Sequence, residues 1–310
     1  MSQTLSFPSI STNVRLSTRA SLRRVGMRAS AAVAPHLAGL WAEQLFLTPP
    51  RNPSLEHRFF DFLGARHRVL PHHDRAIATW SWGHPDSPAV ILAHGWGGAS
   101  AQMRPLVFPL LEAGYRVIAF DQPAHGSSGG RLTALPDFAD VLAEVASRHG
   151  GVVGAVGHSL GAAAVALALA RGLALERVVL FSPPADVVAY SRRFARWNWI
   201  PEGIRAAMQA ATEERYGVRW TELAIERLAA RLKAPALIIH DRDDRVVPYS
   251  QGLRIARHWT NARLLSTSGL GHFDLLEDPS ASQTAADFIA GRSQGASSAN
   301  SSQPYPAPLY

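Results

Sequence analysis

The chain has 310 residues, of which 47% are hydrophobic and 18% are charged, so it can bury a sizeable core in one large or two ordinary domains. It has no cysteine, which excludes disulfides, thiolate metal sites and catalysis by a thiol. The formal net charge is +7, but residues 1–42 hold five arginines and no acidic residue while the remainder is nearly balanced, so the charge does not indicate nucleic-acid binding.

The chain begins with a basic segment rich in Ser, Thr and Arg. Residues 1–28 are predicted to be a disordered tail that precedes a folded domain over residues 29–290. An export or targeting peptide is the alternative, and a cytoplasmic location is the default. Because no run of 18 apolar residues is present, we expect no stable membrane insertion. Ala38–Leu47 predicts a short amphipathic helix that ends before two prolines.

Strand and helix patterns then alternate along the chain. Ala89–Ala93 is fully apolar and is followed by a glycine-rich turn, which is typical of a buried parallel strand. The turn at 72–74 contains two histidines and an aspartate, but no matching ligand cluster stands nearby, so no metal is expected. The pattern predicts an α/β fold with a mainly parallel, eight-stranded sheet flanked by helices, its strands at 66–70, 76–82, 89–93, 116–120, 152–156, 177–181, 236–240 and 262–265.

The alternation breaks over residues 185–232, after the sixth strand. This segment has helical periodicity and many large side chains, which predicts a helical lid over the carboxyl edge of the sheet. We expect most of these side chains to pack together, and Trp197 and Trp199 to face a substrate pocket. Three interleaved arginines at 192, 193 and 196 are interpreted as a solvated face, with a carboxylate-binding role as the alternative. Residues 291–310 are predicted to be a disordered tail.

The sequence G-H-S-L-G at residues 157–161 joins an apolar run to a run of small residues. It matches a strand-to-helix turn that holds a serine in a strained conformation, where residues two before and two after the serine must be nearly free of side chains. Gly157 and Gly161 meet that demand, so Ser159 is the candidate nucleophile. A glycine-rich turn with an incidental serine is the alternative.

A serine nucleophile needs a base, and the base needs a carboxylate that orients it. His272 lies in a glycine-flanked loop after the last strand and is the candidate base. His125 is interpreted as structural, and His158 is expected to point away from the serine. The candidate carboxylate is Asp244, which lies three residues before a valine and a proline that open the next helix.

Three other aspartates compete with Asp244. Asp241 ends a strand and is expected to shape the turn, whereas Asp243 and Asp186 stay open as alternative carboxylates. The oxyanion donors are expected to be the backbone amides of Trp96, in the loop after the third strand, and Leu160, at the start of the helix that follows Ser159. Glycines at 95, 97 and 98 let the loop backbone approach a substrate.

From His94 to Asp278 the sequence resembles α/β-hydrolase fold proteins. The resemblance rests on H-G-x-x-G at 94–98, D-x-P-x-H-G-x-S at 121–128, G-x-S-x-G at 157–161, D-x-x-V-P at 244–248 and G-H-F at 271–273, in the order of that family. Ala124 stands where the family often has glycine. The resemblance implies a hydrolase with the triad Ser159, Asp244 and His272, but it implies no particular substrate.

The sequence therefore predicts an enzyme that cleaves a small or medium apolar carboxylic ester through an acyl-serine intermediate, without a metal or organic cofactor. Its expected partner is a small-molecule substrate, with no nucleic acid, and the oligomeric state stays open. An amide, peptide or carbon–carbon bond hydrolase with the same triad is one alternative. A non-catalytic ligand-binding protein on the same scaffold is another.

Overall fold

The computed structural model describes residues 18–50 and 64–292, which fall into two compact units. One unit, here called the sheet unit, comprises the described residues of 47–187 and 219–292. The other, the helical unit, comprises 18–46 and 188–218. Among the described residues, no helix is both long and apolar enough to cross a membrane.

The sheet unit is built on one eight-stranded sheet in the order β1-β2-β4-β3-β5-β6-β7-β8. The first two strands pair antiparallel, β2 pairs antiparallel with β4, and all the remaining pairs are parallel. This confirms the predicted fold class. The strands are β1 (Arg66–His72), β2 (Arg75–Trp82), β3 (Ala89–Ala93), β4 (Arg116–Phe120), β5 (Val152–His158), β6 (Arg177–Phe181), β7 (Ala236–Asp241) and β8 (Ala262–Thr267).

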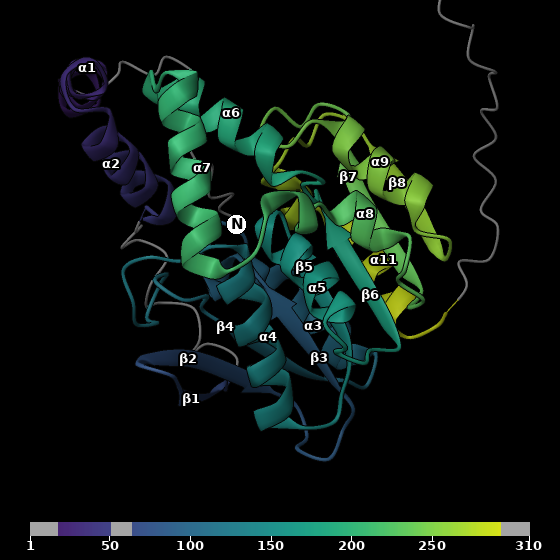
Figure 1. Ribbon diagram of the computed structural model, residues 1–310. Coiled ribbons are helices and arrows are strands. Elements are labelled where there is room, and N and C mark those ends of the chain that lie inside the picture. The colour runs from purple at the N-terminus through teal and green to yellow at the C-terminus, as the bar shows by residue number, and fades with distance from the viewer. Residues whose placement is uncertain (1–17, 51–63, 293–310) are drawn as a thin grey trace, which may run out of the picture. The chain divides into compact units, whose positions relative to one another are not determined.

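Helices cover both faces of this sheet. One face packs against η3, α3, α10 and α11, and the other carries α4, α5, α8 and α9, of which α4 and α5 lie side by side in front of the sheet in Figure 1. Their bounds are η3 (Ser100–Leu106), α3 (Val107–Glu112), α4 (Leu135–His149), α5 (Leu160–Ala170), η4 (Trp220–Glu222), α8 (Ile225–Ala229), α9 (Tyr249–His258), α10 (Asp274–Glu277) and α11 (Pro279–Ile289).

The position of β3 inside the sheet explains why its sequence is apolar throughout. Val90 and Leu92 belong to the core that packs against α3 and α11, and the alternate residue Ile91 faces the other layer. All five residues of the strand are buried. A strand covered on both faces needs apolar side chains at every position, and that composition made it recognisable in the sequence.

The helical unit contains α1 (Thr18–Val33), α2 (Pro35–Leu47, whose last residue the sheet unit includes), α6 (Val187–Asn198, beginning at the boundary) and α7 (Glu202–Tyr216). Within it, the ring of Phe46 meets that of Phe194 edge-on, with centroids 5.2 Å apart. The Arg215 guanidinium donates to the buried Glu43 carboxylate at 2.7 Å. Helix α2 therefore packs with helices that lie far along the sequence.

The N-terminal tail was predicted to be disordered as far as residue 28, and this is wrong for residues 18–28, which form the first part of α1. The reason is a tertiary contact, because Met27 is buried and Gly26 lies against the ring of Trp41 on α2. Residues 1–17 and 293–310 lie outside the described residues, so the rest of the predicted tails is untested.

The segment predicted to be a helical lid is helical, since residues 187–232 contain α6, α7, η4 and α8 without a strand. It is divided between the units, however, because Val188–Val218 groups with α1 and α2 and the rest with the sheet. Trp220 and Met208 are buried, as expected of packing residues, whereas Trp197 and Trp199 are about half exposed, at 48% and 47%. The role of this segment as a lid stays a prediction.

Candidate active site

The strand-to-helix turn at Ser159 has the strained geometry that the sequence predicts. Ser159 lies between β5 and α5 with φ 53° and ψ −122°, a conformation that L residues rarely adopt. A Cβ on Gly157 would lie 2.6 Å from the Cα of Ala162, and one on Gly161 would overlap the carbonyl oxygen of Ala93. Neither glycine can carry a side chain, so the turn is specific to this sequence pattern.

Asp244 and His272 come from the loops after β7 and β8 and form one hydrogen bond. His272 Nδ1 lies 2.7 Å from Asp244 Oδ2, and both residues are buried. The backbone N–H groups of Val246 and Val247 donate to the other carboxylate oxygen, each at 2.8 Å. Because an ionised carboxylate only accepts, Nδ1 of the neutral imidazole carries the proton and Nε2 is left to accept one.

The charge on Asp244 is favoured by its hydrogen bonds. Burial raises the pKa of this carboxyl, but hydrogen bonds from His240, His272 and the Val247 N–H outweigh burial and hold the pKa well below its usual range. The ring of His272 is the nearer of the two, because His240 Nε2 lies 2.9 Å from Val247 O and 3.5 Å from Asp244 Oδ2. Asp244 is therefore ionised at neutral pH and can stabilise a protonated His272.

Two of the competing aspartates, Asp241 and Asp243, have other hydrogen-bond partners. Asp241 accepts from the hydroxyl of Thr267 at 2.7 Å and from the backbone N–H of Asp243 at 2.9 Å. Asp243 in turn accepts from the N–H of Gly269 at 2.8 Å. These bonds hold the loop after β7 against the loop after β8, as expected of turn-shaping residues, and the carboxylate that contacts His272 is that of Asp244.

His158 has a contact that the sequence did not predict. Its Nε2 lies 3.0 Å from the carbonyl oxygen of His272, and the centroids of the His158 and His272 rings are 4.7 Å apart. Burial lowers the pKa of His158 to about 3, so the ring is neutral and donates from Nε2 to that carbonyl. The residue before Ser159 therefore anchors the loop that carries His272 beside the turn.

The loop after β3 lies directly against the serine. A Cβ on Gly95 would come 2.9 Å from the Cβ of Ser159. Two hydrogen bonds to the loop after β4 fix this loop, because His94 Nε2 accepts from the N–H of Gln122 and His125 Nε2 accepts from the N–H of Gly97, both at 2.9 Å. The structural role of His125 is therefore to hold the loop after β3 through the N–H of Gly97.

The predicted oxyanion donors are unpaired among the described residues. Neither the backbone N–H of Trp96 nor that of Leu160, the first residue of α5, has a hydrogen-bond acceptor there. The neighbouring amide of Gly97 is used by His125 and is not available. Two free N–H groups beside the serine, one of them at a helix N-terminus, suit a developing negative charge. Their role as oxyanion donors stays a prediction, as does that of Trp197 and Trp199 in substrate binding.

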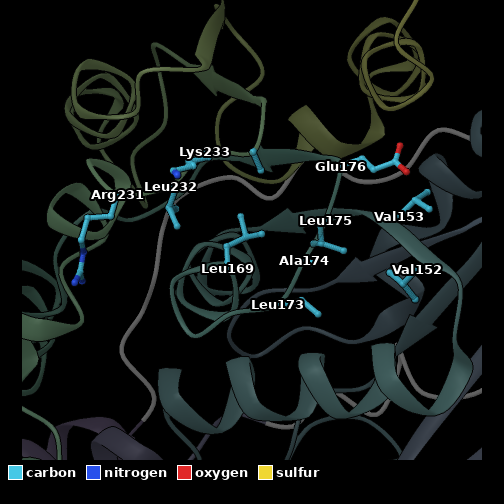
Figure 2. A pocket seen from close by; sticks show the side chains of 11 residues that line it. Val152, Val153, Leu169, Leu173, Ala174, Leu175, Glu176, Arg231, Leu232 and Lys233 are labelled. Atoms are coloured by element: carbon cyan, nitrogen blue, oxygen red, sulfur yellow. The ribbon is translucent and has the colours of Figure 1, made fainter.

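A depression of about 590 Å³ lies elsewhere in the sheet unit. It is lined by residues at the amino ends of β5, β6 and β7, including Val152, Leu173 and Leu232, and by the charged side chains of Glu176 and Lys233 (Figure 2). Ser159 follows the carboxyl end of β5, so this depression is at the opposite edge of the sheet from the candidate active site. Among the described residues, no cluster of three or more His, Asp or Glu side chains could hold a metal ion.

The sheet order, the turn at Ser159 and the bonded Asp244–His272 pair define a hydrolase of the α/β class. The sequence model of the alpha/beta hydrolase family matches residues 90–282, more than half of the chain. The chain therefore belongs to the alpha/beta hydrolase family.

Among its relatives is a bifunctional esterase/perhydrolase of Acinetobacter calcoaceticus, 26% identical over 62% of this chain and 87% of the relative. A putative carbamate hydrolase of Stutzerimonas stutzeri is 27% identical over 63% of this chain and 88% of the relative. The esterase Pf2001 of Pyrococcus furiosus has a similar fold, with a TM-score of 0.61 and 23% identity over 80% of this chain and all of that structure.

Proposed function

We propose that this protein is a serine hydrolase that cleaves a small or medium apolar carboxylic ester through an acyl-serine intermediate. The observation that carries the proposal is the 2.7 Å hydrogen bond between Asp244 and His272, together with Ser159 in a strained turn flanked by Gly157 and Gly161. The family membership and the esterase relative support the same class of reaction.

The proposed reaction begins when His272 Nε2 takes the proton of the Ser159 hydroxyl, and the serine oxygen attacks the ester carbonyl. The imidazolium that forms is stabilised by the ionised Asp244, which accepts from Nδ1. The N–H groups of Trp96 and Leu160 donate to the oxyanion, and one such donor contributes about 3 kcal/mol in the transition state.

When the tetrahedral intermediate collapses, His272 gives its proton to the leaving alcohol and the acyl group stays on Ser159. Water then enters in the place of the alcohol, and His272 removes its proton as it attacks the acyl carbon. Collapse of the second intermediate releases the carboxylic acid and returns the proton to the serine. Every step uses groups of this chain and water.

The proposed substrate class rests on two tryptophans of the helical unit. Trp197 and Trp199 are large and half exposed, which favours an apolar acyl or aryl group if they face the substrate. If they do, replacing either by alanine changes the preferred chain length of the substrate, and an unchanged preference contradicts this part of the proposal.

The test is the hydrolysis of a series of p-nitrophenyl esters of increasing acyl length by the wild type, Ser159→Ala and Ser268→Ala. Ser268 is an exposed serine in the loop that precedes His272, so it is a matched control. We expect turnover by the wild type and the control, and a loss of about 10⁴-fold or more in Ser159→Ala. No turnover of any ester by the folded wild type would contradict the proposed ester specificity.

An amide or carbamate substrate is the second candidate, and the relative named a putative carbamate hydrolase favours it. The same triad and oxyanion donors act on a carbon–nitrogen bond, provided that His272 protonates the leaving nitrogen. Parallel assays with matched anilides and carbamates decide between the two. A kcat/KM for these substrates above that for the esters supports this candidate.

A further inference from the structure

Large apolar side chains are unusually exposed on the first two helices. Ten such side chains are exposed among the described residues, and five of them lie between residues 22 and 40. On α1 these are Leu22 at 68%, Val25 at 60% and Val33 at 86% exposed. Together with the exposed Ala29 they follow a spacing of three and four residues, so they form one stripe on the helix, here called the α1 stripe.

Positive charge flanks the α1 stripe. The 16 residues of α1 include four arginines, and no acidic residue occurs in residues 1–42. Arg28 is exposed and has no ion-pair partner among the described residues. Arg23 donates to the side-chain oxygen of Asn198 at 2.9 Å. Because this partner is neutral, Arg23 keeps its positive charge, and its side chain is exposed. Among residues 18–50 and 64–292, nothing covers the aliphatic stripe of this helix and no acidic side chain pairs with its exposed Arg28.

We propose that α1 docks on an anionic lipid surface, with the α1 stripe in the acyl boundary and its exposed arginines, Arg23 and Arg28, at the headgroups. Helices that lie in a membrane interface combine an apolar face with a basic, otherwise polar remainder in this way. With 16 residues the helix is about 24 Å long, shorter than a hydrocarbon core of about 30 Å, and it carries four arginines, so it lies on the membrane and does not cross it.

Other features of the helical unit agree with this occupant. Trp197 and Trp199 are exposed in the same unit, and the guanidinium groups of Arg193 and Arg24 lie 4.7 Å and 5.4 Å from the centres of the two rings. Tryptophan and arginine are the side chains that favour the headgroup region, so on this proposal the two tryptophans lie at the membrane instead of facing the substrate. A nucleic acid would use the charge but would leave the four aliphatic positions of the α1 stripe exposed to water.

The experiment is co-sedimentation of the full chain with vesicles of phosphatidylcholine alone and of phosphatidylcholine mixed with phosphatidylglycerol. We expect binding to the mixed vesicles only, and weaker binding at high salt because screening reduces the attraction of the arginines. Arg28→Gln is expected to weaken binding about fivefold. The double variant Leu22→Gln/Val25→Gln is expected to weaken it about tenfold or more.

The matched control is Val69→Gln, because Val69 is an aliphatic residue that is 57% exposed on β1, in the sheet unit. It is expected to bind like the wild type, and all variants are expected to keep the wild-type ester hydrolysis in solution. Equal binding to both kinds of vesicle, binding to neither, or an unchanged affinity in the double variant would overturn the proposal. So would a wild-type dimer that the double variant converts to a monomer, since the α1 stripe would then be a contact between copies.

Discussion

Replacing Asp244 by asparagine tests how His272 is oriented. Two backbone N–H groups donate to Oδ1 at 2.8 Å, so the asparagine oxygen keeps that position and the amide nitrogen takes the place of Oδ2, 2.7 Å from His272 Nδ1. The amide donates to Nδ1, the ring proton moves to Nε2, and the imidazole can no longer accept the proton of Ser159. We expect kcat to fall about 10⁴-fold, or about 5 kcal/mol.

The assay is steady-state hydrolysis of the best p-nitrophenyl ester, with circular dichroism and urea unfolding to show that the variant is folded. KM is expected to change little, because the substitution alters the transition state and not the pocket. Asp243→Asn is the control, since Asp243 lies in the same loop and bonds to Gly269 instead of His272. A kcat for Asp244→Asn within tenfold of the wild type, or an equal loss in the control, would refute the reasoning.

Three further predictions concern stability. Gly161→Ala places a methyl group on the carbonyl oxygens of Ala93 and His94, at the end of β3, and is expected to cost about 3 kcal/mol or more in urea unfolding. Burial lowers the pKa of His94 to about 4 and that of His158 to about 3, whereas a histidine of the unfolded chain has a pKa of about 6.5. The two neutral rings therefore contribute fully to stability above pH 6.5, and the protein is expected to lose stability as the pH falls from 6.5 toward 4. Arg215→Met leaves the carboxylate of Glu43 buried and unpaired and is expected to cost about 1–2 kcal/mol.

For each of these three predictions, one measured outcome would contradict the argument. Gly172→Ala is a size-matched comparison for the first, because a Cβ there meets no atom within 4 Å, although its φ of 103° adds strain of its own. Equal losses in the two variants would contradict the steric argument. A melting temperature that does not fall between pH 7 and pH 5 would contradict the second prediction. If Arg215→Met together with Glu43→Gln is no more stable than Arg215→Met alone, the third is wrong.

The strands and the serine turn were predictable because their signals are local. Ala89–Ala93 is apolar at every position, since both of its faces are covered, and Gly157 and Gly161 are required by atoms within a few residues or on the adjoining strand. The choice of Asp244 over Asp243 also rested on local spacing, and the structure brings Asp244 to His272.

What the sequence did not predict depends on contacts between distant residues. The His158 ring bonds to the carbonyl of His272, 114 residues away along the chain. Nothing in G-H-S-L-G indicates whether the histidine makes such a bond or only fills space in the turn. Likewise, Glu43 and Arg215 are 172 residues apart, so nothing near either residue indicated that the first two helices pack with α6 and α7. The start of α1 was assigned to a tail for the same reason, because Met27 looks exposed until its neighbours are known.

The most direct test of the central claim is covalent labelling of the folded wild type with a fluorophosphonate, followed by peptide mapping by mass spectrometry. If Ser159 is the activated nucleophile, one label per chain is found on the peptide that contains it, and Ser159→Ala takes up none. No label on the folded protein, or a label that persists in Ser159→Ala, would contradict the assignment of Ser159 as the nucleophile.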